Sequence, residues 1–295
     1  SISNQQSTIH NLEMPELPEL DIVCEVLERR AIGREVTGIE IVQPGGAIVV
    51  RDLALASAGP LTTASVDRCV ESVKRRGKFL VFGLGDAYWM VINPKLSGRL
   101  QLAMPGDRRR KDTCLVVTLR GAGDEPVELR YFDPKTMGQI YVVSDLAKVP
   151  EYAEMGPEAL EISLQEFRER LRPFRGEIKG VLVRSAFVAG IGNAYADEIL
   201  WAAQLHPYRK RTSLKADEVE RLYQAMRDTL IEARDLVRAE MGDAIHLKPR
   251  DFMKVHMRAG QPCPRCGNVI SEITANQRIT DFCRTCQPGG LIKGL

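Results

Sequence analysis

The chain has 295 residues, 44% of them hydrophobic and 27% charged, with 41 Lys and Arg against 39 Asp and Glu. This composition is that of a globular protein and argues against a disordered or fibrous chain. No apolar run reaches the roughly 18 residues of a membrane helix, and no signal-peptide pattern opens the chain. We therefore expect a soluble protein with room for two domains and no membrane partner. The net charge of +2 does not identify a partner by itself.

The first predicted element is a helix that begins with prolines. Leu20, Val23, Val26 and Leu27 recur at helical spacing, and Gly33 can end the helix. A proline in the first turn is ordinary, because its missing N–H would be unpaired there anyway. Residues 1–13 are polar, lack an initiator Met and show no periodicity. We expect them to be disordered, or to be upstream sequence outside the mature protein.

The order Met14-Pro15-Glu16 also has a chemical interpretation. If Met14 is the initiator and is removed, Pro15 carries a free secondary amine beside a carboxylate. A chain-terminal amine has a pKa of about 8, against about 10.4 for lysine, so roughly a tenth of it is neutral near pH 7. A neutral amine is a nucleophile for sugar or carbonyl carbons. From this stretch alone, Pro15 can be interpreted either as the start of a helix or as a nucleophile.

A series of short strands follows the first helix. Turns rich in Gly, Pro and Asp separate them. So many short strands in about a hundred residues predict a sandwich or barrel-like pair of sheets, with the first helix packed on or across it. The predicted strands are Val36–Val42, Asp67–Lys74, Phe79–Leu84, Tyr88–Asn93, Ser97–Leu102, Thr113–Leu119, Val127–Phe132 and Gln139–Val143.

Helices follow a linker at 154–158. A Ser163-x-x-Glu166 capping box opens the first of them. The segment 189–193 contains two glycines and then Asn193, which can cap the next helix. Exposed N–H groups at such a turn bind phosphate well, but taken alone the motif is more typical of a simple helix hairpin. The predicted helices are Ser163–Leu171, Glu177–Phe187, Ala194–Ala203 and Leu214–Glu240, and the sequence leaves open whether the last is continuous or broken.

Four of the seven cysteines form two C-x-x-C pairs separated by sixteen residues. This spacing fits a tetrahedral zinc site, and four protein sulfurs leave no open position, so the ion is structural. We expect the other three, at 24, 69 and 114, to be buried free thiols, and the protein to be cytosolic. The predicted zinc ligands are Cys263, Cys266, Cys283 and Cys286.

The zinc segment predicts a basic β-hairpin. Its strands are Val269–Thr274 and Ile279–Phe282, with residues 276–278 near the tip. Seven Lys and Arg lie between 248 and 286 against three acids. Further basic clusters lie at 74–78, 108–111 and 209–211. Together the basic segments indicate that the protein binds a polyanion such as a nucleic acid. Zinc ribbons also bind proteins, so a protein partner stays open.

These motifs together resemble the formamidopyrimidine-DNA glycosylase and endonuclease VIII family. The resemblance runs from Met14 to about Gly290 and rests on the order of Met14-Pro-Glu-Leu-Pro-Glu, Gly190-Ile-Gly-Asn-Ala-Tyr-Ala-Asp-Glu and the zinc hairpin ending in Gln287. It implies an α+β multidomain fold: an N-terminal helix with a two-layered β-sandwich over 14–148, a helix–two-turn–helix domain over 155–245, and a Cys₄ zinc-finger β-hairpin over 250–288.

The family resemblance also implies an activity. The protein would be a bifunctional DNA glycosylase and abasic-site lyase that excises formamidopyrimidines, 8-oxoguanine or oxidised pyrimidines. Its partner would be double-stranded DNA with oxidised bases or abasic sites, lying in a cleft between the halves with the damaged nucleotide flipped out. One structural zinc ion, a monomeric state and a location in the bacterial cytoplasm complete the expectation.

Residue roles follow by matching motifs. The amine of Pro15 would attack C1′, and the Schiff base formed would allow β,δ-elimination. Glu16 would be the acid/base, and Lys78 would grip the backbone beside the lesion. The other matched positions are Glu19 as a supporting carboxylate, Lys179 near the flipped nucleotide, and Asn193 and Arg278 as phosphate ligands.

In the family, certain side chains fill the space that the flipped nucleotide leaves in the base stack. This chain departs from the family pattern at those residues. Leu96 stands where a methionine is usual, and Lys135-Thr136-Met137 stands in the turn that normally holds two arginines and a phenylalanine. Leu96 and Met137 remain apolar wedges, but Lys135 lacks the bidentate fork of arginine.

Two further departures bear on the choice of lesion. Arg184-Ser185 replaces an Asp-Gln pair, and the segment 242–260 is too short for much of the loop that caps oxidised purines. Two alternatives therefore stay open: a lyase-inactive paralogue that binds damaged DNA, and a zinc-ribbon protein that binds RNA or serves assembly.

Overall fold

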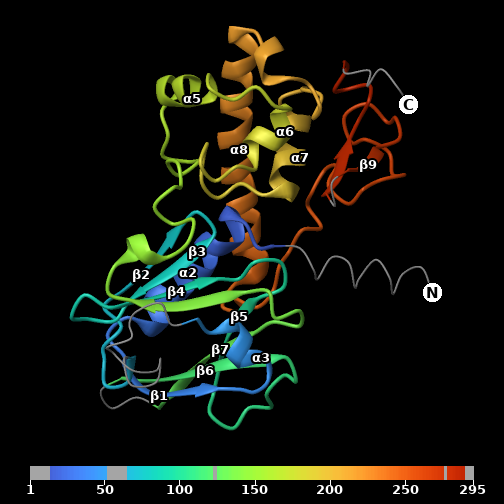
Figure 1. Ribbon diagram of the computed structural model, residues 1–295. Helices are drawn as coiled ribbons and strands as arrows, with labels where there is room; N and C mark the ends of the chain where they lie inside the picture. The colour runs from blue at the N-terminus through green and yellow to red at the C-terminus, as the bar shows by residue number, and fades with distance from the viewer. Residues whose placement is uncertain (1–13, 52–64, 122–124, 276–277, 290–295) are drawn as a thin grey trace. The chain divides into compact units, whose positions relative to one another are not determined.

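The computed structural model describes residues 14–51, 65–121, 125–275 and 278–289 (Figure 1). The predicted disorder of residues 1–13 and part of the predicted hairpin tip lie outside these ranges. The chain divides into two compact units, one up to Ala153 together with Val237–Pro249, the other Glu154–Leu236 together with the chain from Arg250 onward. Among the described residues, no helix has the length and apolarity to cross a membrane.

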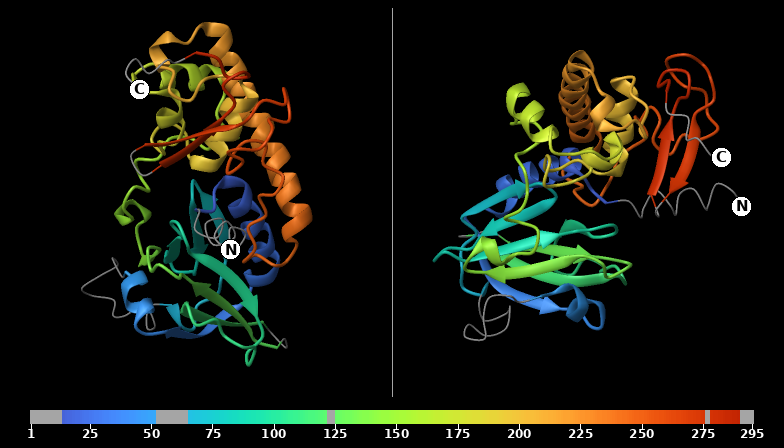
Figure 2. Two further views of the ribbon diagram at one scale, coloured as in Figure 1. Left: turned by 90° about the vertical axis from the view of Figure 1, so that its right-hand side faces the viewer. Right: turned by 45° about the horizontal axis from the view of Figure 1, so that its top comes forward.

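The first unit contains two antiparallel four-stranded sheets, stacked as layers in Figures 1 and 2. One sheet has the order β1 (Glu35–Ile41), β6 (Thr113–Arg120), β7 (Val127–Phe132) and β5 (Arg99–Ala103). The other has the order β2 (Ser72–Arg76), β3 (Phe79–Gly83), β4 (Trp89–Asn93) and β8 (Gln139–Val143). The predicted two-layered sandwich is thus confirmed, with each predicted strand present and its ends shifted by a few residues.

Helix α2 (Leu17–Ala31) covers the outer face of the second sheet. Leu20 and Val23 line the same small cavity as Leu80 of β3 and Ile92 of β4. This explains why the five residues of β3 are all buried: one face meets the other sheet and the opposite face meets the helix. The sandwich therefore fixes the position of the helix that begins beside Pro15.

The outer face of the first sheet carries a buried ion network. Arg130 of β7 is 1% exposed, and its guanidinium lies 2.6 Å from a carboxylate oxygen of Glu128. Arg130 also donates to the carbonyls of Met104 and Asp107, and Arg109 pairs with Glu128 at 3.4 Å. The β5–β6 loop is thereby held over the strand, because a buried charge needs such partners.

The second unit is helical and ends in the zinc hairpin. Its helices are α5 (Leu164–Leu171), α6 (Ile178–Leu182), α7 (Asn193–Ala202) and α8 (Ala216–Met241), and its strands are β9 (Ser271–Ala275) and β10 (Arg278–Phe282). Ser163 caps α5 by accepting the N–H of Glu166 at 3.1 Å, as predicted. Helix α8 is continuous, and its last turn belongs to the first unit.

Several local predictions were wrong. Helix α6 ends at Leu182 and not at Phe187, because the backbone of Ser185 and of Ala189 bonds instead to residues 156, 157 and 159. Gly192, not Asn193, is the N-cap of α7. A short helix, α3 (Gly45–Val49), stands where a turn was expected, and Cys69 is exposed although Cys24 and Cys114 are buried.

Candidate functional site

The predicted nucleophile and acid lie where α2 begins. Glu16 is the N-cap residue, and its N–H donates to the Glu19 carboxylate at 2.9 Å in a capping box. Pro15 is buried, and Glu16 and Glu19 are 2% and 1% exposed. Both carboxylates are thus fixed at the start of the helix.

A small apolar cavity of about 20 Å³ borders Pro15 within the first unit. Its wall includes Ile245 and Leu247, from the segment that follows α8. Asp243 of this segment pairs with Arg29 of α2 at 3.0 Å, and Arg238 in the last turn of α8 pairs with Glu25 of α2 at 2.7 Å. The part of the short segment 242–260 that belongs to the first unit, up to Pro249, therefore packs beside the predicted nucleophile, and no local pattern identified its two apolar residues.

Lys78 is half-buried in the hairpin turn between β2 and β3. Gly77 before it has φ +57°, a conformation that glycine adopts without strain. Arg75 of β2 pairs with Asp21 of α2 and also donates to the carbonyl of Gly77 at 3.0 Å. The Lys78 turn is therefore tied to the same helix that carries Glu16.

The predicted wedge residues remain exposed to solvent. Leu96 lies in the turn between β4 and β5 with 38% of its surface exposed, and Met137 lies in the turn between β7 and β8 with 45% exposed. Lys135 is exposed in the second of these turns. All three belong to the first unit, as do Pro15 and Lys78.

In the second unit, the structure brings Lys179, Asn193 and the zinc hairpin together. The carbonyl of Ile279 in β10 accepts from Lys179 Nζ at 2.8 Å and from Asn193 Nδ2 at 2.9 Å. An amide has two N–H donors, so the bond to Ile279 uses one of the two N–H groups of Asn193. Arg278, exposed, directly precedes Ile279 and starts β10. The predicted phosphate ligands are thus neighbours, although their contact with DNA stays a prediction.

Lys179, predicted to lie near the flipped nucleotide, is buried among partners of its own unit. It is 6% exposed and lies 2.7 Å from Asp197 Oδ1 on α7. Asp197 in turn lies 2.9 Å from His256 Nδ1, and Asp281 of β10 lies 3.7 Å from the same nitrogen. Asp197, His256 and Asp281 could together bind a metal ion, but Lys179 already supplies a positive charge there.

The neighbouring Glu198 (5% exposed) holds the segment before the zinc finger. Its carboxylate accepts the N–H groups of residues 254, 255 and 256, each at 2.8 Å. Burial raises the pKa of Glu198, and these three bonds oppose the rise. Sequence reasoning gave Asp197 and Glu198 no role. One sequence signal could have identified them: they are two adjacent acidic residues in an otherwise mostly apolar helix. Buried carboxylates of this kind need hydrogen-bond or charge partners.

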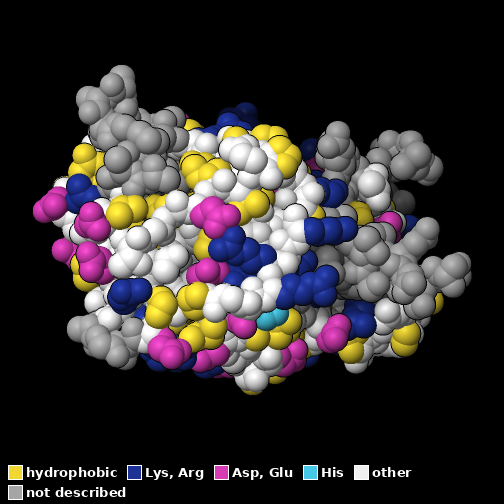
Figure 3. Space-filling model, turned by 90° about the horizontal axis from the view of Figure 1, so that it is seen from below, with side chains coloured by type: hydrophobic (Ala, Val, Ile, Leu, Met, Phe, Trp, Pro, Cys, Tyr) yellow, Lys and Arg dark blue, Asp and Glu magenta, His cyan; other side chains and the backbone are white. Residues whose placement is uncertain are grey.

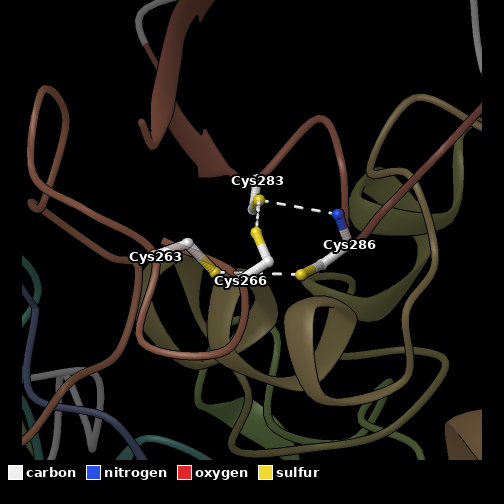
Figure 4. Close-up of side chains that lie close together, drawn as sticks. All are labelled: Cys263, Cys266, Cys283 and Cys286. Atoms are coloured by element: carbon white, nitrogen blue, oxygen red, sulfur yellow. Dashed lines mark hydrogen bonds between the residues drawn. The ribbon is translucent and has the colours of Figure 1, made fainter. Parts of the chain in front are cut away.

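The four predicted zinc ligands point toward one another (Figure 4). Cys263 Sγ lies 3.8 Å from Cys286 Sγ, and Cys266 Sγ lies 3.5 Å from Cys283 Sγ. A tetrahedron of sulfurs about 2.3 Å from a zinc ion has edges of roughly 3.8 Å, so the cluster fits one ion.

Hydrogen bonds around the sulfurs support zinc binding. Trp201 donates its indole N–H to Cys263 Sγ at 3.4 Å. Burial raises the pKa of the Cys263 thiol, but this bond and backbone N–H bonds outweigh it and bring the pKa to about 6. A thiolate is the form that binds zinc.

Many residues of the basic clusters have acidic or backbone partners within their own unit. Arg109 lies 2.6 Å from Glu40, Arg110 lies 3.0 Å from Asp112, and Arg209 Nη2 lies 2.8 Å from Glu218. Figure 3, seen from the side of the β1 sheet, shows basic groups next to acidic ones. These clusters are therefore weaker evidence for binding of a polyanionic partner than the sequence alone suggested.

Comparisons with known proteins agree with this arrangement. Three family models match in order: the formamidopyrimidine-DNA glycosylase N-terminal domain at 14–140, the H2TH domain of the same family at 155–242, and a zinc finger found in FPG and IleRS at 260–289. A formamidopyrimidine-DNA glycosylase from Symbiobacterium thermophilum is 35% identical, over 93% of this chain and 90% of the relative. One from Pelotomaculum thermopropionicum is 32% identical, over 93% and 99%.

Solved structures show the same likeness. A MutM structure in complex with DNA containing carbocyclic 8-oxo-G matches with a TM-score of 0.81 and 28% identity, over 93% of this chain and 100% of that chain. The Lactococcus lactis Fpg in complex with DNA containing an abasic site matches with the same values. From its three matched domains and its full-length relatives, the chain belongs to the formamidopyrimidine-DNA glycosylase family.

Proposed function

We propose that this protein is a DNA glycosylase and abasic-site lyase that excises oxidised bases from double-stranded DNA. The observation that carries the proposal is the packing of Pro15, Glu16 and the Lys78 turn on one helix, bordered by a cavity. The family relationship supports the same activity. We place the protein in the bacterial cytoplasm, as a monomer acting on the chromosome.

The proposed reaction starts at the nitrogen of Pro15. Its lone pair attacks C1′ of the damaged nucleotide, and the bond from C1′ to the base breaks as the base leaves with a proton. Glu16, held at the helix start, would transfer protons at the sugar. The sugar ring then opens as the C1′–O4′ bond breaks and O4′ takes a proton, which leaves an iminium between Pro15 and C1′. This iminium acidifies the neighbouring C2′–H, so that the 3′ and then the 5′ phosphate leave by β- and δ-elimination.

The remaining residues would bind DNA. Lys78 would hold backbone phosphates beside the lesion, with Glu19 supporting the sugar, while Asn193 and Arg278 would hold phosphates from the second unit. Leu96 and Met137 would occupy the space left by the flipped nucleotide, and Lys135 would face the opposite base. Lys179 is proposed to lie near the flipped nucleotide. Zinc held by the four cysteines stabilises the hairpin that carries Arg278.

The nitrogen of Pro15 must be an amine for this chemistry. In the printed sequence it is an amide, because Met14 precedes it. We propose that the active form begins at Pro15, because Met14 is removed. Its domains would then be the predicted 14–148 without Met14, 155–245 and 250–288.

The test compares protein that begins at Pro15 with the full 295-residue chain, after mass spectrometry of both N-termini. Borohydride added to a duplex with one abasic site is expected to trap a covalent complex only with the first protein. Absence of trapping with a free Pro15 amine would refute the lyase. If that protein still bound damaged duplex more tightly than intact duplex, a lyase-inactive binding protein would be the better assignment.

A further inference from the structure

One buried carboxylate lies between the two turns that carry Leu96 and Met137. Asp133 follows β7 directly and is 2% exposed. The first turn connects β4 to β5, and the second connects β7 to β8. Leu96 and Met137 are exposed apolar side chains on these turns.

The Asp133 carboxylate accepts hydrogen bonds from both turns. Its Oδ1 accepts from the Ser97 hydroxyl, which is next to Leu96. Its Oδ2 accepts the N–H of Gly138, which is next to Met137, at 2.7 Å. Oδ1 also accepts the N–H of Lys135 at 3.3 Å. One rigid group therefore connects the side chain of Ser97, next to Leu96, to the backbone on both sides of Met137.

The phenol of Tyr131 fills the remaining space between the turns. Its hydroxyl donates to Asp133 Oδ2 at 3.4 Å, and the residue is 1% exposed. A Cβ atom added at Gly98 would lie 1.9 Å from this hydroxyl, and one added at Gly138 would lie 1.8 Å from it. Both turns thus approach Tyr131 so closely that only glycine fits on either side. Burial, and then the charge of Asp133, raise the pKa of Tyr131, which keeps the hydroxyl protonated and able to donate.

We propose that Asp133, with Tyr131, is a positioning residue that presents Leu96 and Met137 as one wedge of fixed spacing. The proposal rests on the proposed function, in which these two side chains occupy the space that the flipped nucleotide leaves in the base stack. A wedge unstacks bases only if it is held rigidly, since side chains that are free to move yield to the stacked bases. Asp133 acts on this step through the turns and contacts no nucleotide itself.

The test separates base unstacking from chemistry by changing only how the lesion is paired. Two substrates carry the same single lesion, 8-oxoguanine or dihydrothymine, whichever the unsubstituted protein excises faster. In one the lesion is fully paired, and in the other it lies in a short bubble of mismatched bases. An unpaired base costs less to flip, so the bubble needs less help from the wedge.

Asp133→Asn keeps the size of the side chain, but its amide N–H₂ faces the Gly138 N–H or, if flipped, the Lys135 N–H, so that two donors meet. Single-turnover excision from the paired substrate is expected to fall about 10- to 100-fold. Excision from the bubble is expected to fall less than about threefold. Replacing both Leu96 and Met137 by Ala should give the same ratio between substrates.

Glu128→Gln is the matched control, because Glu128 is a similarly buried carboxylate of β7 outside these turns. It should affect the two substrates equally. If Asp133→Asn does not fold, Ser97→Ala removes only the bond on the Leu96 side and should still lower excision more from the paired substrate. Equal loss on both substrates, or no loss on either, would overturn the proposal. Failure of the unsubstituted protein on both substrates and in borohydride trapping would instead overturn the proposed function.

Discussion

Replacing Lys179 by methionine tests whether this residue supports the zinc hairpin from inside the second unit. The ammonium donates to Ile279 O and Thr280 Oγ1 and lies 2.7 Å from Asp197 Oδ1, with Lys179 6% and Asp197 1% exposed. Removing one partner of a buried ion pair costs about 3–5 kcal/mol. Asp197 keeps its contact with His256 at 2.9 Å, so the lower end of this range applies.

A loss of about 3 kcal/mol corresponds to a fall in Tm of roughly 6–12 °C for a chain that unfolds cooperatively. Calorimetry measures the Tm, and titration of labelled duplex at several salt concentrations measures DNA affinity. The control is Lys210→Met, because Lys210 pairs with Glu177 at 3.7 Å with both side chains exposed and should lose less than about 1 kcal/mol. An unchanged Tm, together with a salt slope reduced by about one, would show that Lys179 binds phosphate directly and would refute the supporting role.

Three further predictions concern stability and zinc. Arg130→Met leaves Glu128 buried without its main partner and should lower the free energy of unfolding by about 3–5 kcal/mol in urea titrations, and a loss under about 1 kcal/mol would contradict the network. The hydrogen bond from Arg209 lowers the pKa of Glu218, so this pair stabilises the fold above the unfolded pKa of about 4.3 and loses its effect as pH falls through the lower folded pKa. The Tm difference between wild type and Glu218→Gln should therefore be largest near neutral pH and shrink in acid, and a constant difference would argue against it. Cys286→Ser should lower both the zinc content measured by atomic absorption and the DNA affinity, and full retention of zinc would refute the four-sulfur site.

Regular elements and the zinc site were predicted from local sequence because their signals are local. The strands from Phe79–Gly83 to Gln139–Val143 show runs of apolar residues between turn-forming residues, and these runs end near the observed strand ends. The C-x-x-C pairs place two sulfurs on each tight turn regardless of the surrounding fold. The helix end at Phe187 was predicted wrongly, because the backbone of Ser185 and of Ala189 bonds to a segment nearly thirty residues earlier in the chain.

The sequence by itself determined the family, the order of domains, the zinc ligands and the candidate nucleophile Pro15, since each depends on residue type and spacing along the chain. Only the tertiary structure decided that the segment with Ile245 and Leu247 borders Pro15, that Lys179 is buried against Asp197, and that Asp133 connects two turns. The physical reason is that burial and hydrogen bonding depend on which distant segments meet. A lysine or an aspartate in a local pattern looks the same whether water or a buried partner surrounds it.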